Sequence, residues 1–235
     1  MGLDIYVGSL TRYYSGNWET IVQQAGKAQG KPVYLHRADP PGAIEDPGTI
    51  QRIVLAWRAK LDKELKQRLA SPLDWNEDPT APYFKDKPTW ECYEDLVIFA
   101  AYEEHPELQR PTEHVQDMTT DLAFRLSTGK GFESRYSQLV TGVQLWLPCE
   151  FRFTFAAKDA GGRLAGIGSS VTLQRQLEDL NNRTWRANAA TLAQWRWQGA
   201  APDASLEVGA RFACSLLLAL ADESVKNHLP MKLDY

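Results

Sequence analysis

Hydrophobic positions along the chain recur with both helical and strand spacing, and together they predict an α+β fold. Residues 3–8 alternate apolar and polar positions, as a half-buried strand does. Between 46 and 70 the apolar residues recur every three or four positions, which indicates a long amphipathic helix that begins at Asp46 and Pro47. Residues 139–168 are rich in β-branched and aromatic residues with a period of two, and they predict strands joined by a glycine-containing turn.

The remaining segments complete a prediction of helices packed on a small, mostly antiparallel sheet. We expect a short strand at 31–36 and further helices at 17–29, 88–105 and 112–126. Helices also occupy 169–226, and the last of them is apolar nearly all round from 212 to 221. Such a helix is expected at the centre of the fold. One domain is predicted to span residues 1–235, with the first half mainly helical after its first strand.

The composition also predicts the cellular location of the protein. The chain has 235 residues, 43% of them hydrophobic, which is enough for a core that needs no disulfide. Its three cysteines are far apart and form no CxxC pair, so we expect reduced thiols and a cytoplasmic protein. The first residues lack a basic stretch and carry Asp4 inside their apolar run, which favours a strand over a secretion signal. The run at 212–221 is about half of the ~20 residues that span a bilayer, so we expect no membrane partner.

Charge is distributed unevenly, and this suggests a protein-binding surface. Residues 74–107 hold ten carboxylates against two lysines, a local net charge of −8, directly after a basic helix. A solvated face explains most such runs, but an acidic surface can also steer a basic partner. A segment near the N-terminus adds aromatic and arginine side chains typical of binding hot spots. The predicted partner-binding residues are Glu91, Asp95, Glu103 and Glu104 on the acidic surface, and Arg12, Tyr13, Tyr14 and Trp18 in an aromatic loop.

A metal site is the alternative hypothesis. If 112–126 is helical, His114, Asp117 and Asp121 share one face, and His105 comes from the end of the preceding helix. Imidazole and carboxylate groups suit zinc, manganese or iron, which would activate a water for hydrolysis. The spacing also fits an ordinary solvated helix face, and no HExxH string is present.

Two further patterns are weaker. His36, Arg37 and Asp39 follow a predicted strand, where a ligand site or an ordinary polar turn would use the same residue types. Nucleic-acid binding is not expected, because the net charge of −4 disfavours a polyanion.

These observations favour a non-catalytic intracellular interaction protein that binds another, basic protein. An immunity- or antitoxin-like protein is one class with this charge pattern. No cofactor is expected in that interpretation, whereas a divalent metal belongs to the alternative, a metal-assisted hydrolase.

Overall fold

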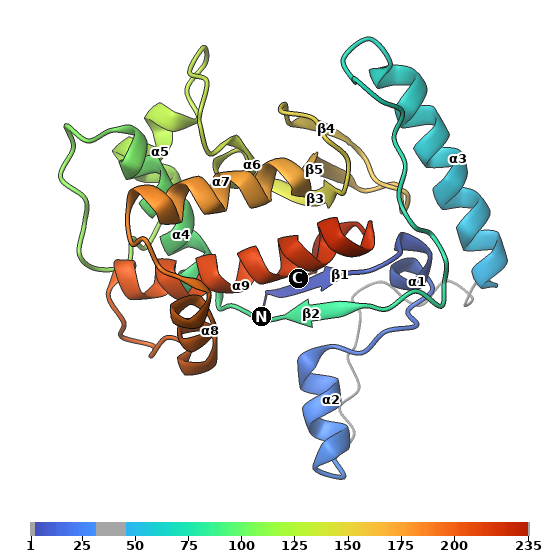
Figure 1. Cartoon of the computed structure of the whole chain (residues 1–235), viewed down its shortest axis with the longest axis horizontal. Coiled ribbons are helices and arrows are strands. Elements are labelled where there is room, and N and C mark those ends of the chain that lie inside the picture. Colours follow the sequence, from blue (N-terminus) through green and yellow to red (C-terminus); the bar gives the residue numbers. More distant parts are fainter. Residues whose placement is uncertain (1–2, 32–45, 235) are drawn as a thin grey trace.

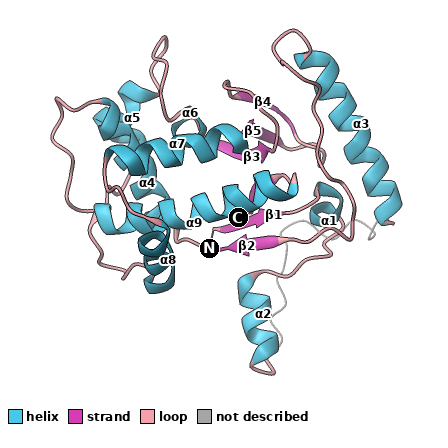
Figure 2. Ribbon diagram, viewed as in Figure 1, coloured by secondary structure: helices cyan, strands magenta, loops and turns pink. Residues whose placement is uncertain are grey.

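The computed structural model describes residues 3–31 and 46–234, and a six-stranded sheet runs through them (Figures 1 and 2). The strand order is β2-β1-β6-β3-β5-β4. All neighbouring pairs are antiparallel except β3 and β5, which are parallel. The predicted combination of helices and sheet is confirmed, but the sheet is mixed. Its strands are β1 (Asp4–Val7), β2 (Phe84–Asp86), β3 (Val143–Leu147), β4 (Phe155–Lys158), β5 (Leu164–Ser169) and β6 (Met231–Asp234).

Helices cover both faces of this sheet. They are α1 (Leu10–Tyr14), α2 (Ile21–Ala28), α3 (Pro47–Leu65), α4 (Trp90–Glu104), α5 (Leu122–Ser127), α6 (Ser137–Val140), α7 (Ser170–Arg183), α8 (Ala189–Gln198) and α9 (Leu206–Asn227), with a 3-10 turn, η1 (Met118–Thr120). No helix in the described residues is both long and apolar enough to cross a membrane.

The larger core lies between the sheet and helices α4, α7 and α9. Figure 1 shows α7 and α9 running side by side across the sheet. Because side chains alternate along a strand, Ile5, Val7, Met231 and Leu233 point into this core from β1 and β6. Leu216 and Leu217 of α9 are fully buried. The predicted central position of the apolar closing helix is therefore confirmed.

The second core lies on the other face, under α3. Asp46 caps this helix by accepting a hydrogen bond from the backbone N–H of Thr49 at 3.2 Å, as its place before Pro47 predicts. The buried stripe of α3 contains Ile50, Val54, Leu61 and Leu65, and it belongs to one cluster with Leu145, Leu147 and Ile167 of the sheet.

Two predicted helices differ from the structure. The helix expected at 17–29 is present as α2 but begins later, because Thr20 forms the capping box at its start, and α1, capped by Ser9, is a separate short helix before it. The helix expected at 112–126 does not exist, since Asp117 and Asp121 accept backbone N–H bonds that start η1 and α5. An aspartate that caps a helix start cannot also lie in the interior of one longer helix. The strand predicted at 31–36 lies, after its first residue, outside the described part of the chain.

Strand β6 was not predicted, although it lies at the centre of the sheet between β1 and β3. Strand β4 begins only at Phe155, later than the alternation of 151–157 suggests. The glycine turn is confirmed: Asp159 donates its backbone N–H to Arg163 at 2.8 Å, and Gly162 has a φ of 82°.

Candidate functional site

The four residues of the predicted metal site do not converge. His105 contacts Ser127, with 3.2 Å between Nε2 and Oγ. His114 contacts Asp95, with 2.8 Å between Nδ1 and Oδ1. The two imidazoles therefore serve different neighbours, and each already has a polar partner.

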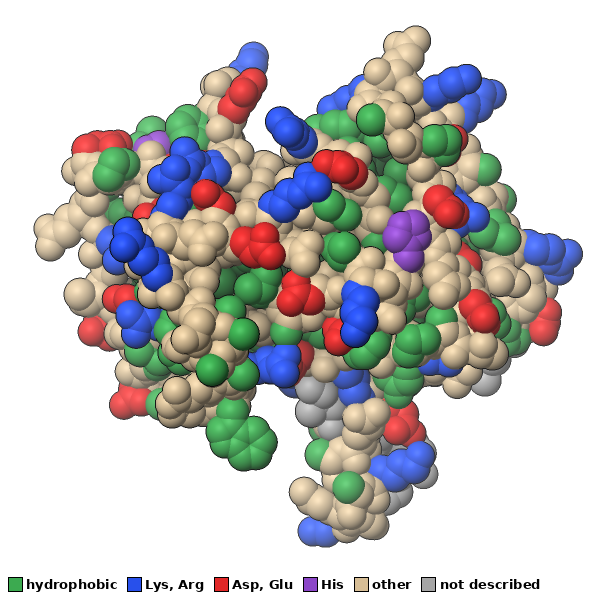
Figure 3. Space-filling model, in the orientation of Figure 1, with side chains coloured by type: hydrophobic (Ala, Val, Ile, Leu, Met, Phe, Trp, Pro, Cys, Tyr) green, Lys and Arg blue, Asp and Glu red, His purple; other side chains and the backbone are tan. Residues whose placement is uncertain are grey.

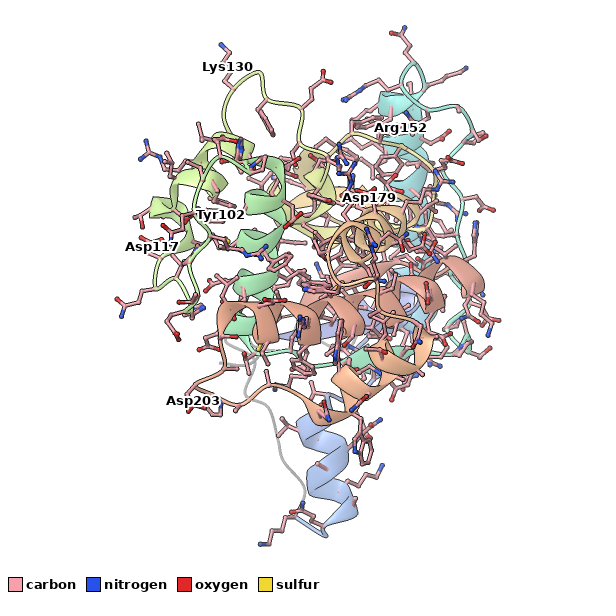
Figure 4. All side chains as sticks on the ribbon, turned by 60° about the vertical axis from the view of Figure 1, so that its left-hand side comes forward. Tyr102, Asp117, Lys130, Arg152, Asp179 and Asp203 are labelled. Atoms are coloured by element: carbon pink, nitrogen blue, oxygen red, sulfur yellow. The ribbon has the colours of Figure 1, made fainter. Side chains whose placement is uncertain are left out.

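The two aspartates of that prediction have structural roles. Asp117 lies on a loop outside α4 (Figure 4) and accepts the backbone N–H of Thr119 at 2.9 Å. Asp121 caps α5 and accepts a 3.0 Å hydrogen bond from the Tyr102 hydroxyl. In residues 3–31 and 46–234 no group of three or more His, Cys, Asp or Glu side chains is placed to hold a metal ion.

The predicted acidic residues are mostly occupied inside the molecule. Glu103 pairs with Arg110 at 3.0 Å, and Glu104 accepts a 2.9 Å hydrogen bond from the Ser134 hydroxyl. Asp95 is buried against His114, and burial raises the pKa of Asp95 although His114 opposes the shift. Only Glu91 of the four is exposed. On the face drawn in Figure 3, acidic and basic side chains are interspersed.

The predicted aromatic loop is packed against the sheet. Arg12, Tyr13 and Tyr14 belong to α1, and Trp18 is only 7% exposed. The Trp18 ring lies 4.9 Å from the ring of Tyr6 in β1 and stacks on Tyr13 at 5.6 Å. These rings are therefore part of the interior and are not an open binding surface.

Beneath α1 lies a buried polar cluster, formed by Tyr13, Tyr14, Asp159, Lys232 and Asp234. Lys232 of the central strand β6 pairs with Asp159 at 3.1 Å. Tyr13 donates its hydroxyl hydrogen to Asp234. Burial opposes ionisation of Asp159, yet the Lys232 ammonium group and hydrogen bonds lower the pKa of this carboxyl below its ordinary value. The charged groups of this cluster satisfy one another, so we assign the cluster to stability.

His36, Arg37 and Asp39, the predicted ligand residues, lie outside the described residues.

The open site is a groove at the outer edge of the sheet, which we call the edge groove. It has a volume of about 420 Å³. Its lining comes from β2, α8 and α9, and comprises Phe84, Lys85, Asp86, Arg196, Ala219, Leu220, Asp222 and Glu223. Strand β2 is the outermost strand on this side, so the groove follows a sheet edge.

Charge in the edge groove is only partly matched. The Lys85 ammonium group donates to the carbonyl of Glu19. Asp222 accepts a 2.7 Å hydrogen bond from the Gln174 amide, and Glu223 accepts a 2.9 Å hydrogen bond from the Asn227 amide. Neither carboxylate forms an ion pair with any residue that the structure describes. A cation supplied from outside would therefore meet carboxylates that form no ion pair within the described part of the chain.

Helix α8, which lines this groove through Arg196, also carries an exposed indole. Trp197 follows the groove residue Arg196 on α8 and is 91% exposed, the largest exposure among the large hydrophobic side chains described. Trp195, on the same helix, packs edge-on against Trp185 at 5.8 Å. Because 100° separates successive helical residues, residues two positions apart point nearly opposite ways, so the packing of half-buried Trp195 against Trp185 leaves Trp197 in solvent.

No family model, curated protein or solved structure matches this chain.

Sequence reasoning missed the edge groove because its walls are far apart in the chain. Two signals were available: the acidic pair Asp222 and Glu223 directly follows the apolar run of α9, and Trp195 and Trp197 cannot share a helix face.

Proposed function

We propose that this protein is an interaction protein that binds an extended segment of another protein, containing Lys or Arg, in the edge groove. The observation that supports it best is that the groove holds Asp222 and Glu223, two carboxylates without an ion-pair partner in the described residues, while Trp197, the residue after the groove residue Arg196, is exposed. Tryptophan is prominent among hot-spot residues at protein interfaces, and its exposure in the free protein has no structural benefit.

The chemistry of the groove favours a cationic segment. Asp222 and Glu223 can accept charge-assisted hydrogen bonds from a Lys or Arg side chain. The face of the Trp197 indole can bind the same kind of cation through its π-electrons. Burial raises the pKa of Asp86, while the Lys87 backbone N–H and the nearby Arg196 oppose this shift, so Arg196 already neutralises part of the groove. The free acceptors are therefore on the α9 side.

The outer strand favours an extended conformation of the partner. β2 pairs with β1 along one side and ends the sheet on the other. An extended segment can add to such an edge through backbone hydrogen bonds, which give affinity, while flanking side chains give specificity. The two components act together: the edge orients the segment and the carboxylates select its charge.

The cellular compartment and the class of the partner remain predictions. The three cysteines are free thiols, two of them buried, which supports a reducing compartment such as the cytoplasm. An immunity- or antitoxin-like role would be a special case in which the basic segment belongs to a toxic enzyme. Its support is charge complementarity alone.

A peptide-display selection tests the proposal. The full-length protein is immobilised and used to select from a library of random 12-residue peptides at low salt. We expect enrichment of sequences with at least two Lys or Arg residues at alternating positions, because side chains of an extended segment alternate between faces. We also expect their binding to weaken as salt screens the groove.

The variant Asp222→Asn with Glu223→Gln keeps the shape of the groove and removes its charge. Asp203→Asn, an exposed aspartate on the loop before α9 (Figure 4), is the matched control. Peptides that bind the control but not the double variant support the proposal. A library that yields no enrichment, or peptides that bind the double variant equally well, would refute it.

A further inference from the structure

A second hollow, which we call the corner cavity, lies where α5, α6 and the segment after β3 meet. It has a volume of about 850 Å³, within the range of small-molecule sites. Aromatic rings form much of its wall, and its lining includes Phe124, Ser127, Phe132, Val140, Arg152 and Phe153. Figure 4 shows Lys130 on the loop after α5, which rises beyond α4, and Arg152 on a separate segment across from it.

Ser127 is the one lining serine with a histidine partner among the described residues. Its Oγ lies 3.2 Å from His105 Nε2. The other two lining serines have different roles: Ser134 donates to Glu104, and Ser137 accepts from the Gln176 amide. The pairing therefore singles out Ser127 within this cavity.

The local sequence explains why the imidazole is there. Pro106 disfavours helical geometry in the residue before it, so α4 ends at His105, which has φ −127° and ψ 65°. The His105 side chain turns inward, is buried, and lies against the ring of Phe132 with 5.1 Å between centroids. Phe132 in turn lines the cavity.

A carboxylate completes the arrangement on the other side of the ring. Glu107 Oε1 lies 3.5 Å from His105 Nδ1. The serine thus faces Nε2 and the acid faces Nδ1, which is the order of roles in serine hydrolases: nucleophile, base and the acid that orients the base. Glu107 is largely exposed, so we expect its contribution to be the smallest of the three.

We propose that Ser127, His105 and Glu107 hydrolyse carboxylic esters with an apolar acyl group that occupies the corner cavity. This activity goes beyond protein binding and uses a different site. The phenylalanines of the wall provide apolar contact for the acyl group, and Ser127 lines the same cavity.

The reaction proceeds in two steps. Ser127 Oγ attacks the carbonyl carbon while His105 Nε2 takes the hydroxyl proton. The bond from carbon to the alcohol oxygen then breaks, and His105 returns the proton to the departing alcohol. In the second step His105 takes a proton from water, whose oxygen attacks the acyl carbon. The bond from the acyl carbon to Ser127 Oγ then breaks, His105 gives its proton to that oxygen, and the carboxylic acid leaves.

Covalent labelling tests the assignment. The full-length protein is treated with a fluorophosphonate probe, and the labelled residue is located by peptide mass spectrometry. We expect one adduct, on Ser127. Hydrolysis of p-nitrophenyl butyrate is measured in parallel, and Ser127→Ala is expected to lower its rate about 100-fold or more.

The variants separate catalysis from structure. Ser71→Ala, an exposed serine outside the corner cavity, is expected to keep labelling and rate. Glu107→Gln is expected to lower the rate about 10-fold and to move the acidic limb of the pH profile to lower pH, because the imidazolium loses a nearby negative charge and the base is neutral over a wider pH range. A merely structural Glu107 would leave the profile unchanged.

Two outcomes would contradict the assignment of Ser127 as the nucleophile. Folded wild-type protein that takes no label on Ser127, or a Ser127→Ala variant that hydrolyses the ester as fast as wild type, would overturn the proposal. If Ser127→Ala does not fold, the site of the adduct on the wild-type protein decides the question.

Discussion

The buried polar cluster and the edge groove are both rich in charge, yet they differ in how that charge is matched. In the cluster, Lys232 pairs with Asp159 at 3.1 Å, and Asp234 accepts from Tyr13. In the groove, Asp222 and Glu223 have only neutral amide donors. Charge that is matched inside the fold is costly to unpair, whereas charge left unmatched at a surface is available to a partner.

The largest effect we expect is on stability, from breaking the cluster. Asp159→Asn removes the counter-charge of Lys232 and leaves an ammonium group buried. The free energy of unfolding should fall by about 3–5 kcal/mol, as for other broken buried pairs. Urea denaturation measures this change. The control Asp203→Asn should stay within about 0.5 kcal/mol of wild type. A loss below about 1 kcal/mol in Asp159→Asn would mean that water already reaches Lys232.

The next effect is on binding, from removing the indole. Trp197→Ala should weaken a peptide obtained from the display selection by about 2 kcal/mol, or roughly 30-fold in Kd. Stability should hardly change, because the side chain is 91% exposed. Isothermal titration calorimetry gives the Kd. Leu164→Ala is the matched control, since Leu164 is 74% exposed on β5, away from β2 in the strand order. Equal losses in both variants would argue against a role specific to Trp197.

A smaller effect is expected from the groove charge. Asp222→Asn with Glu223→Gln should raise the Kd of the same peptide about 10-fold, or about 1.4 kcal/mol, at low salt. The difference from wild type should shrink as salt rises, because exposed charges are screened over about 10 Å at 0.1 M. Its unfolding free energy should match that of wild type, in contrast to Asp159→Asn. A salt-independent difference would point to shape, and not charge, as the cause.

The smallest effect concerns pH. The folded-state pKa of Asp159 is lowered, so its contribution to stability is complete above the ordinary Asp pKa of about 3.9 and is lost as pH falls through the folded-state pKa. The stability difference between wild type and Asp159→Asn should therefore narrow below about pH 4. Urea titrations at a series of pH values would show this. A difference that stays constant down to pH 2 would contradict the ion pair.

Much of the fold could be predicted from the pattern of hydrophobic and polar positions. Helix α3 is predictable because a single apolar stripe and an Asp-Pro start agree, and α9 is predictable because its apolar run has no polar face to expose. Strand β6 was not predicted because it has only four residues and two of them, Lys232 and Asp234, are charged. The partners of these two side chains, Asp159 and Tyr13, are distant in sequence.

The site was less predictable than the fold. Helical spacing alone suggested that His114, Asp117 and Asp121 share a face, but capping by the two aspartates divides that segment. The edge groove combines residues 84–86, 196 and 219–223, so only the folded structure shows that they meet. The local sequence indicates which residues are charged or exposed, but it does not indicate which charged side chains form ion pairs in the folded protein.

Hydrogen–deuterium exchange of the full chain, with and without the selected basic peptide, tests the central claim most directly. If the edge groove is the binding site, the backbone amides of 84–86 should exchange more slowly when the peptide is bound, because an added strand protects an outer strand. Amides near the buried polar cluster, in β6, should not change. Slower exchange confined to other elements, with 84–86 unaffected, would contradict the account.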